Sequence, residues 1–267
     1  MTTADELLLI ALVPYRRRVR IRDADRLRFA LRAAELADLG RAGRIVVGRR
    51  RIEVTDPRPV DDRRLNNVLR GLAAAHPPPG LGEWLRRTPG SLTVEYLSRL
   101  EDRKTVRVRR WREAGGRTRH DIVLVDRSRR REVLDRLAAV VRSGPDGSPG
   151  ERDLTLAALV QAAGLASAVH PGVRGTLGRR RLAALAAGGH LAPGAGGAGP
   201  AADEELAAAL VAGSDGLTRQ LQGELGDLYA DFTTGGHGLG HSADPGSWSD
   251  GGAGSTGHHG GGGHGGW

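Results

Sequence analysis

The stretch Asp25–Ala42 reads DRLRFALRAAELADLGRA and predicts one long, mostly buried helix. Leucine, phenylalanine and alanine cover well over half of its helical circumference, and Gly43 follows as a stop signal. The charged residues Arg28, Arg32 and Glu35 fall together in a narrow sector, which we call the polar wedge. We therefore expect a helix that is buried on most sides, with only this charged edge reaching solvent.

Further helices are predicted along the following 150 or so residues by the same hydrophobic periodicity. They lie at about 61–75, 81–87, 92–103, 128–142, 154–169 and 174–187. Two pairs of short alternating segments predict β-hairpins, one joining 44–47 to 51–54 and the other joining 106–108 to 122–125. The predicted fold class is mainly α, a single globular helical domain with one or two β-hairpins.

No segment of the sequence is expected to cross a membrane. Leu7–Val13 is apolar but too short to span a bilayer, and it follows Asp5 and Glu6 rather than the positive charge of a signal peptide. Leu154–Val173 reaches spanning length, but it is rich in alanine and interrupted by polar residues, which favours a buried core helix. The absence of cysteine excludes disulfides and fits a reducing compartment, so we expect a cytoplasmic protein.

Composition and charge both change after Gly188. We divide the chain into a helical domain (1–190), a Gly/Ala linker (191–202), an acidic helical segment (203–232) and a Gly/His-rich tail (233–267) predicted to be disordered. Residues 201–267 hold nine acidic residues and one arginine, a net charge of −8, while the remainder carries +17. A charge of that size attracts polyanions. The acidic segment is expected to fold back over the basic body and to weaken anion binding.

No catalytic or cofactor-binding pattern is recognisable in the sequence. Outside the tail the histidines are scattered, and no nucleophile elbow, P-loop or dinucleotide fingerprint is present. The tail histidines offer imidazole ligands, but nothing in a glycine-rich coil preorganises them for a metal ion. We therefore predict a non-enzymatic protein with no catalytic residues, no cofactor and no metal site.

The arginine-rich hairpin between residues 106 and 125 leaves a second function open. A helix at 92–103 followed by a basic β-ribbon is typical of the recognition helix and wing of winged-helix DNA-binding proteins. Nucleic acid is therefore the alternative partner, although the acidic residues of that helix offset its arginines. The same hairpin also has a purely structural interpretation. It would be the edge of a sheet, and its charges would prevent pairing with a sheet of another molecule.

One block of sequence resembles the Golgi phosphoprotein 3 family, including its bacterial members, which are common in actinobacteria. Leu31–Ile45 matches the family pattern Leu-Arg-x-x-x-Leu-x-(Asp/Glu)-Leu-x-x-x-Gly-Arg-(Ile/Leu) without a gap. The apolar strip Glu6–Leu12, the turn and helix over 57–69, and the order of the later elements also fit the family. The similarity covers residues 4–190 or so.

This resemblance implies a mainly helical domain that binds anionic lipid headgroups at a membrane surface. Eukaryotic members bind phosphatidylinositol 4-phosphate through a tryptophan and a few arginines. Arg32 occupies the position of one of these arginines, the tryptophan falls on Asp23, and two further arginines fall near Gly90 and Thr93. This chain lacks that tryptophan and those two further arginines. The arginines available to rebuild a phosphate site are Arg86 and Arg87, which lie close by, and Arg18, Arg20 and Arg22, which are expected in the loop before the helix.

The resemblance thus predicts a peripherally membrane-associated protein with a basic binding site. The residues proposed to bind the headgroup are Arg18, Arg20, Arg22, Arg32, Arg86 and Arg87. The family also uses a β-hairpin for self-association, which implies a homo-oligomer and a scaffold for protein interactions as a third function. The hairpin residues assigned to oligomerisation are Arg107, Arg109, Trp111 and Arg117.

Overall fold

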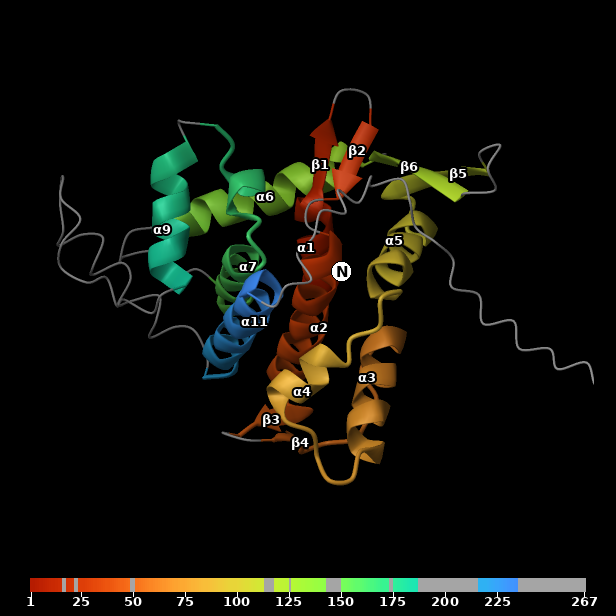
Figure 1. Cartoon of the computed structure of the whole chain (residues 1–267), viewed down its shortest axis with the longest axis vertical. Coiled ribbons are helices and arrows are strands. Elements are labelled where there is room, and N and C mark those ends of the chain that lie inside the picture. Colours follow the sequence, from red (N-terminus) through yellow and green to blue (C-terminus); the bar gives the residue numbers. More distant parts are fainter. Residues whose placement is uncertain are drawn as a thin grey trace, which may run out of the picture.

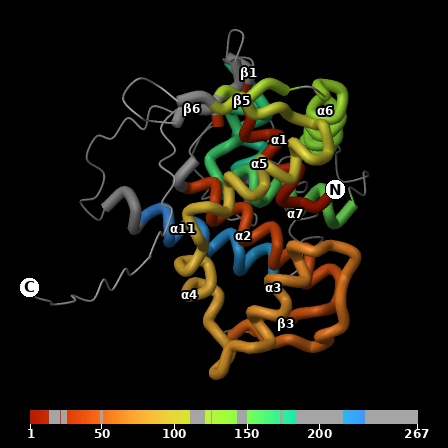
Figure 2. The backbone as a smooth tube through the Cα atoms, turned by 90° about the vertical axis from the view of Figure 1, so that its right-hand side faces the viewer, coloured from red at the N-terminus to blue at the C-terminus, as the bar shows by residue number. Residues whose placement is uncertain are grey.

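A computed structural model describes residues 1–15, 18–21, 24–48, 51–112, 118–124, 126–142, 150–172, 175–186 and 216–234. Helices dominate these ranges, so the mainly α class predicted from the sequence is confirmed. Figures 1 and 2 show a helical body with a small sheet at each of two opposite ends. The predicted linker (191–202), residues 203–215 of the acidic segment and residues 235–267 of the Gly/His-rich tail lie outside the described residues.

The elements follow one another in the order shown in Figure 1. The helices are α1 (Thr3–Ala11), α2 (Ala24–Arg41), α3 (Arg63–Ala74), α4 (Leu81–Arg86), α5 (Leu92–Asp102), α6 (Arg127–Arg142), α7 (Glu151–Ala162), α8 (Ala166–Val169), α9 (Thr176–Ala186) and α11 (Gly216–Thr234). The strands are β1 (Leu12–Tyr15), β2 (Arg18–Ile21), β3 (Ile45–Val47), β4 (Ile52–Val54), β5 (Val106–Arg112) and β6 (Thr118–Leu124).

Helix α1 is the centre of the core, and every one of its residues is buried. It begins at a capping box, in which the Asp5 amide donates to Thr2 Oγ1 and the Thr2 amide donates to the Asp5 carboxylate. Asp38 of α2 accepts hydrogen bonds from both the amide and the hydroxyl of Thr3. At the other end, Arg130 Nε donates to the Leu9 carbonyl at 3.1 Å. In the sequence this segment is recognisable only as a short apolar run. The acidic residues Asp5 and Glu6, which are buried in the structure, interrupt the apolar pattern that would predict a buried helix.

Helix α2 lies where the sequence placed it, but its polar wedge is not at the surface. Glu35 is fully buried and Arg32 is 8% exposed. The expectation that this edge reaches solvent is therefore wrong for both residues. Arg32 and Glu35 are buried because α3 and α5 pack on α2. This packing brings Arg64 and Tyr96 into contact with the Glu35 carboxylate.

Two antiparallel sheets carry the strands. The predicted hairpins are both confirmed, with Ile45 opposite Val54 in the β3–β4 pair and β5 paired with β6 over its whole length. The sequence missed the β1–β2 hairpin, which joins β6 at Val19 and completes a sheet of order β1-β2-β6-β5. Arg18 and Arg20, expected in a loop, lie on β2 instead, because the alternation of Arg18 to Ile21 suits a strand.

The helix predicted over 154–169 is two helices, α7 and α8. Helix α7 begins three residues earlier, at Glu151, and ends before Gly164. Gly164 has a φ of +69°, a conformation that side chains with a Cβ disfavour, so the chain turns there before α8 begins. Leu165 remains almost fully buried after the turn, which keeps α8 against the core.

Helix α11 extends the packed core beyond residue 190, where the sequence placed the end of the helical domain. It packs on α2, α4 and α7. Leu221, Leu225 and Leu228 are at most 3% exposed, and the Thr218 hydroxyl lies 3.3 Å from that of Thr155 on α7. Of its acidic residues, Asp227 is exposed and Glu224 is half-buried against Gly82 of α4, so an acidic sequence here accompanies a helix that belongs to the core.

We expect Leu225→Ala to lower the free energy of unfolding by about 2–5 kcal/mol, because it removes a fully buried side chain between α11 and the body. The matched control is Leu177→Ala on α9, where the leucine is 57% exposed and the expected loss is below about 0.5 kcal/mol. Urea titration of both variants measures the difference. Equal stability of the two variants would contradict the packing of α11.

Candidate functional site

Three buried carboxylates hold six arginines in ion pairs between the core helices. Asp5 on α1 pairs with Arg99 of α5 and with Arg103, the residue directly after α5. Glu6, also on α1, pairs with Arg136 of α6 and Arg152 of α7. Glu35 on α2 pairs with Arg32 of its own helix and Arg64 of α3. Each carboxylate therefore holds a neighbouring helix against the core, and the role of these arginines is primarily structural.

Glu35 lies at the centre of a buried polar cluster. Arg32 Nη1 donates to Glu35 Oε2 at 2.7 Å, and Arg64 Nε and the Tyr96 hydroxyl donate to Oε1 at 2.8 and 3.0 Å. Burial, followed by the negative charge of Glu35, raises the pKa of Tyr96 well above its usual range, so the hydroxyl remains a donor. Burial lowers the pKa of Arg32, and the charge of Glu35 opposes that shift.

Arg32 is thus bound inside the protein. Besides its bond to Glu35, its guanidinium carbon lies 5.7 Å from the centre of the Trp84 ring of α4, a cation–π distance. The side chain of Arg32 is 10% exposed, which leaves little of the guanidinium accessible to a phosphate from solution. The position that the family resemblance assigns to a headgroup arginine therefore supports the packing of α2 on α3 and α4.

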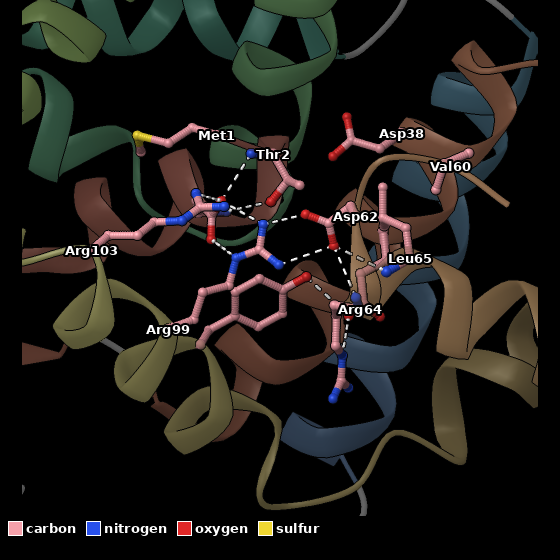
Figure 3. A network of polar contacts seen from close by, with 12 residues as sticks. Met1, Thr2, Asp38, Val60, Asp62, Arg64, Leu65, Arg99 and Arg103 are labelled. Atoms are coloured by element: carbon pink, nitrogen blue, oxygen red, sulfur yellow. Dashed lines mark hydrogen bonds and ion pairs between the residues drawn. The ribbon is translucent and has the colours of Figure 1, made fainter.

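A second network joins α1, α3 and α5, and Figure 3 shows its arginines converging on two carboxylates. Arg99 Nε lies 2.9 Å from Asp5 Oδ1, and Arg99 Nη1 donates to Asp62 Oδ1 at 3.0 Å. Arg103 Nη1 donates to Asp5 Oδ2 at 2.7 Å. Arg99 of α5 and Arg103, the residue directly after it, therefore both bind the buried Asp5. This arrangement argues against α5 as a recognition helix for DNA, which requires basic side chains directed outward.

Asp62 has two roles in this network. It is the N-cap of α3, accepting the amides of Arg64 and Leu65 at 3.0 and 3.2 Å, and it binds Arg99. Burial tends to raise the pKa of Asp62, but the hydrogen bonds from Arg99 and the two amides outweigh burial and hold the pKa below its ordinary value. The ionised carboxylate is therefore the form that stabilises the junction of α3 and α5.

Arg28 is the functional candidate that the sequence analysis left out. Its Nη1 lies 3.6 Å from the point where a Cβ on Gly90 would stand, in the loop between α4 and α5. Within the described part of the chain its buried Nε has no hydrogen-bond partner. Gly90 is where the family resemblance expects an arginine. Arg28 therefore brings a guanidinium to that place from α2, and its position one turn before Arg32 was the signal available in the sequence.

Arg86 and Arg87 come directly before the same loop. Both are exposed, and Arg87 Nη2 forms an ion pair with Glu83 at 2.5 Å. Such a pair between two largely exposed side chains contributes little and can exchange for another anion. We call the surface formed by Arg28, Arg86, Arg87 and the loop 88–91 the basic loop surface. Of the predicted headgroup residues it contains Arg86 and Arg87, which the structure brings to the same loop as Arg28.

The remaining predicted residues lie elsewhere or beyond description. The side chains of Arg18 and Arg20 and the whole of Arg22 fall outside the described residues. Arg107 and Arg109 of the hairpin are exposed on β5, while the side chain of Trp111 and all of Arg117 lie outside the described residues. Since α5 joins the loop 88–91 to the hairpin, the two basic regions are separated by a helix of about 16 Å.

Fold and site together define a mainly helical protein whose core is built on arginine–carboxylate pairs and which presents a basic loop beside the buried helix α2. A family model described as Golgi phosphoprotein 3 (GPP34) matches residues 4–212. Because the match covers most of the chain, this protein belongs to the Golgi phosphoprotein 3 family, as the resemblance predicted. No curated protein matches the chain.

Two general features of the described ranges bear on its chemistry. None of the helices there is at once long and apolar enough to pass through a bilayer. In the same ranges, no three or more histidine, aspartate or glutamate side chains gather in a way that could hold a metal ion.

We expect Glu35→Ala to lower the free energy of unfolding by about 3–5 kcal/mol, because it leaves two guanidinium groups in the core without their shared carboxylate. Glu95→Ala is the matched control, since Glu95 also pairs with Arg64 but its side chain is 42% exposed. Its expected cost is about 1 kcal/mol or less. Denaturant titration compares the two, and a similar loss in both would refute a special role for Glu35.

The lowered pKa of Asp62 predicts a pH-dependent contribution to stability. A carboxylate with a folded-state pKa below its unfolded value stabilises the protein above the unfolded pKa of about 3.9, and this contribution is lost as pH falls through the folded-state pKa. The stability gap between wild type and Asp62→Asn should therefore be full at pH 7 and close on acidification below about pH 4. Asp61→Asn removes the same charge at an exposed neighbour as a control. A gap that does not change with pH would contradict the assignment.

Proposed function

We propose that this protein is a non-enzymatic, peripheral membrane protein that binds anionic lipid headgroups through the basic loop surface. The observation that carries the proposal is the guanidinium of Arg28 beside Gly90, at the place where the family resemblance expects a headgroup-binding arginine. Arg86 and Arg87 add two exposed positive charges at the same loop. The headgroup that the resemblance favours is phosphatidylinositol 4-phosphate, whose phosphate monoester suits guanidinium groups.

Arginine chemistry supports this choice of ligand. A guanidinium presents donors in a fixed planar fork, matches two oxygens of one phosphate and keeps its charge at any physiological pH. Each basic group near an anionic surface contributes about 1 kcal/mol, and ions screen it beyond about 10 Å. Three arginines at one loop thus suffice for reversible docking. The net charge of +17 outside residues 201–267 adds long-range attraction to any such surface.

The segment of chain before α2 also favours a basic binding site near Arg28. Arg18 and Arg20 stand on β2, and the chain passes from β2 through Arg22 into α2, which carries Arg28 near its start. The predicted set of Arg18, Arg20 and Arg22 therefore belongs to the connection that leads to Arg28. We propose that these side chains extend the headgroup site along the bilayer surface.

Self-association through the hairpin is a second proposal. Strand β5 is an edge strand in the order β1-β2-β6-β5, and Arg107 and Arg109 are exposed on it. An edge strand offers unpaired backbone groups to a second chain, while its arginines oppose direct pairing of two identical edges. An oligomer formed here would leave the loop 88–91 free, because the length of α5 lies between them.

We expect the protein to co-sediment with vesicles that contain phosphatidylinositol 4-phosphate or phosphatidylserine, and not with neutral phosphatidylcholine vesicles. Arg28→Ala should weaken binding to phosphoinositide vesicles about fivefold or more, which corresponds to one lost charge contact. Arg131→Ala is the control, because it removes the same charge from an exposed position on α6.

Three results would count against the proposal. Failure to bind any of the three vesicle types would refute membrane docking. Equal losses in Arg28→Ala and Arg131→Ala would show that the charge has no defined site on the protein. A complex with duplex DNA at physiological salt, in the absence of vesicle binding, would favour the nucleic-acid alternative.

A further inference from the structure

Helix α11 lies outside the segment that the family model matches. The match ends at residue 212, and α11 begins at Gly216. Even so, α11 packs along α2 and also contacts α4 and α7, as Figures 1 and 2 show. It therefore lies beyond the matched segment and covers helices that carry the basic loop surface.

The packing of α11 on α2 is antiparallel and runs nearly the full length of α2. Near the start of α11, Leu217 lies so close to Gly40 that any side chain at Gly40 would displace it. Near the other end, the Tyr229 hydroxyl donates to the Arg26 carbonyl at 2.9 Å, and the Tyr229 ring centre lies 5.5 Å from the Arg26 guanidinium carbon. Glycine at position 40 thus leaves room for the Leu217 side chain against α2.

An acidic residue of α11, Glu224, reaches a member of the basic loop surface. The helix carries three acidic residues and Arg219, a net charge of −2. The carboxyl carbon of Glu224 lies 3.2 Å from the point where a Cβ on Gly82 would stand, and Arg86 Nη1 lies 3.4 Å from the same point. The Glu224 carboxylate and the Arg86 guanidinium are therefore neighbours, and a lipid phosphate at Arg86 would meet a fixed negative charge.

Release of α11 would uncover apolar surface beside the basic loop. Ala33 and Ala37 share the α2 face with Arg26 and Gly40 by helical spacing, and both are at most 3% exposed. Leu85 of α4 is also fully buried. Apolar surface bordered by arginines is the pattern of a protein face that lies in the interfacial region of an anionic bilayer. The acidic α11, by contrast, is repelled by that bilayer.

We propose that α11 is a built-in competitor of the anionic membrane, and that docking requires its release from α2 and α4. With α11 in place, Glu224 opposes binding of phosphate at Arg86 and the helix covers the apolar surface. On an anionic bilayer, headgroup phosphates replace Glu224, and the uncovered faces of α2 and α4 contact the interface. This inference rests on the proposed lipid binding and adds its regulation.

A reversible disulfide tests the requirement for release. The Leu217 Cγ, whose place a cysteine sulfur would take, lies 3.8 Å from the Cβ position at Gly40, so a small rotation of the two side chains closes a disulfide of about 2.0 Å, and the chain has no cysteine to compete. The full-length Gly40→Cys, Leu217→Cys variant is compared in its oxidised and reduced states on phosphatidylserine-containing vesicles. Because a lock removes the competent state, the oxidised form should bind at least about tenfold more weakly than the reduced form. Wild-type binding should not respond to the reductant.

The outcomes separate this inference from the proposed function. Equal binding of the oxidised and reduced forms would overturn the requirement for release while leaving lipid binding intact. Absence of binding in both forms and in wild type would overturn both statements. Glu224→Gln provides a second test without new packing: it should strengthen binding severalfold, whereas Asp227→Asn, at an exposed position of the same helix, should have a smaller effect. Identical affinities of Glu224→Gln and wild type would overturn the competition at Arg86.

Discussion

Asp5 and Glu6 enter the core on a helix that has no exposed residue, and their charges have to be neutralised within the protein. An unpaired carboxylate in such surroundings would be prohibitively costly, so each takes two guanidinium groups from other helices. These pairs fix α5, α6 and α7 around α1, and the pairs at Glu35 do the same for α2 and α3. Removing one carboxylate would leave two cations in its place, which is why the arrangement of the helices depends on so few acidic residues.

The composition of the chain suits this construction. Lys104 is the only lysine among 40 basic residues, and an arginine can bind two carboxylates at once through different nitrogens. Arg99 bridges Asp5 and Asp62, and Arg136 bridges Glu6 and Asp153. A basic sequence of this kind indicates affinity for polyanions, but some of its arginines are paired with carboxylates inside the fold. The surface available to a ligand is defined by the arginines that remain.

Most helices could be predicted from the sequence because their apolar residues recur at helical spacing, as in α2, α3 and α5. Helix α1 could not, since Asp5 and Glu6 resemble the polar start of a surface segment and only the tertiary pairs show that they are buried. The same limit applies to the candidate site. Helical spacing places Arg28, Arg32 and Glu35 on one side of α2, but which of them faces the loop at Gly90 depends on where α3, α4 and α5 pack. A local pattern does not contain that information.

The contact between Leu217 and Gly40 separates two properties of the proposed membrane docking. In that proposal Arg28, Arg86 and Arg87 set how strongly the basic loop surface holds a phosphate, whereas the fit of Leu217 against Gly40 sets how firmly α11 stays in place. A single added methyl group on α2 could loosen the cover without altering any residue that meets the ligand. Related chains could thus acquire very different responses to the same bilayer by changing one small residue far from the headgroup.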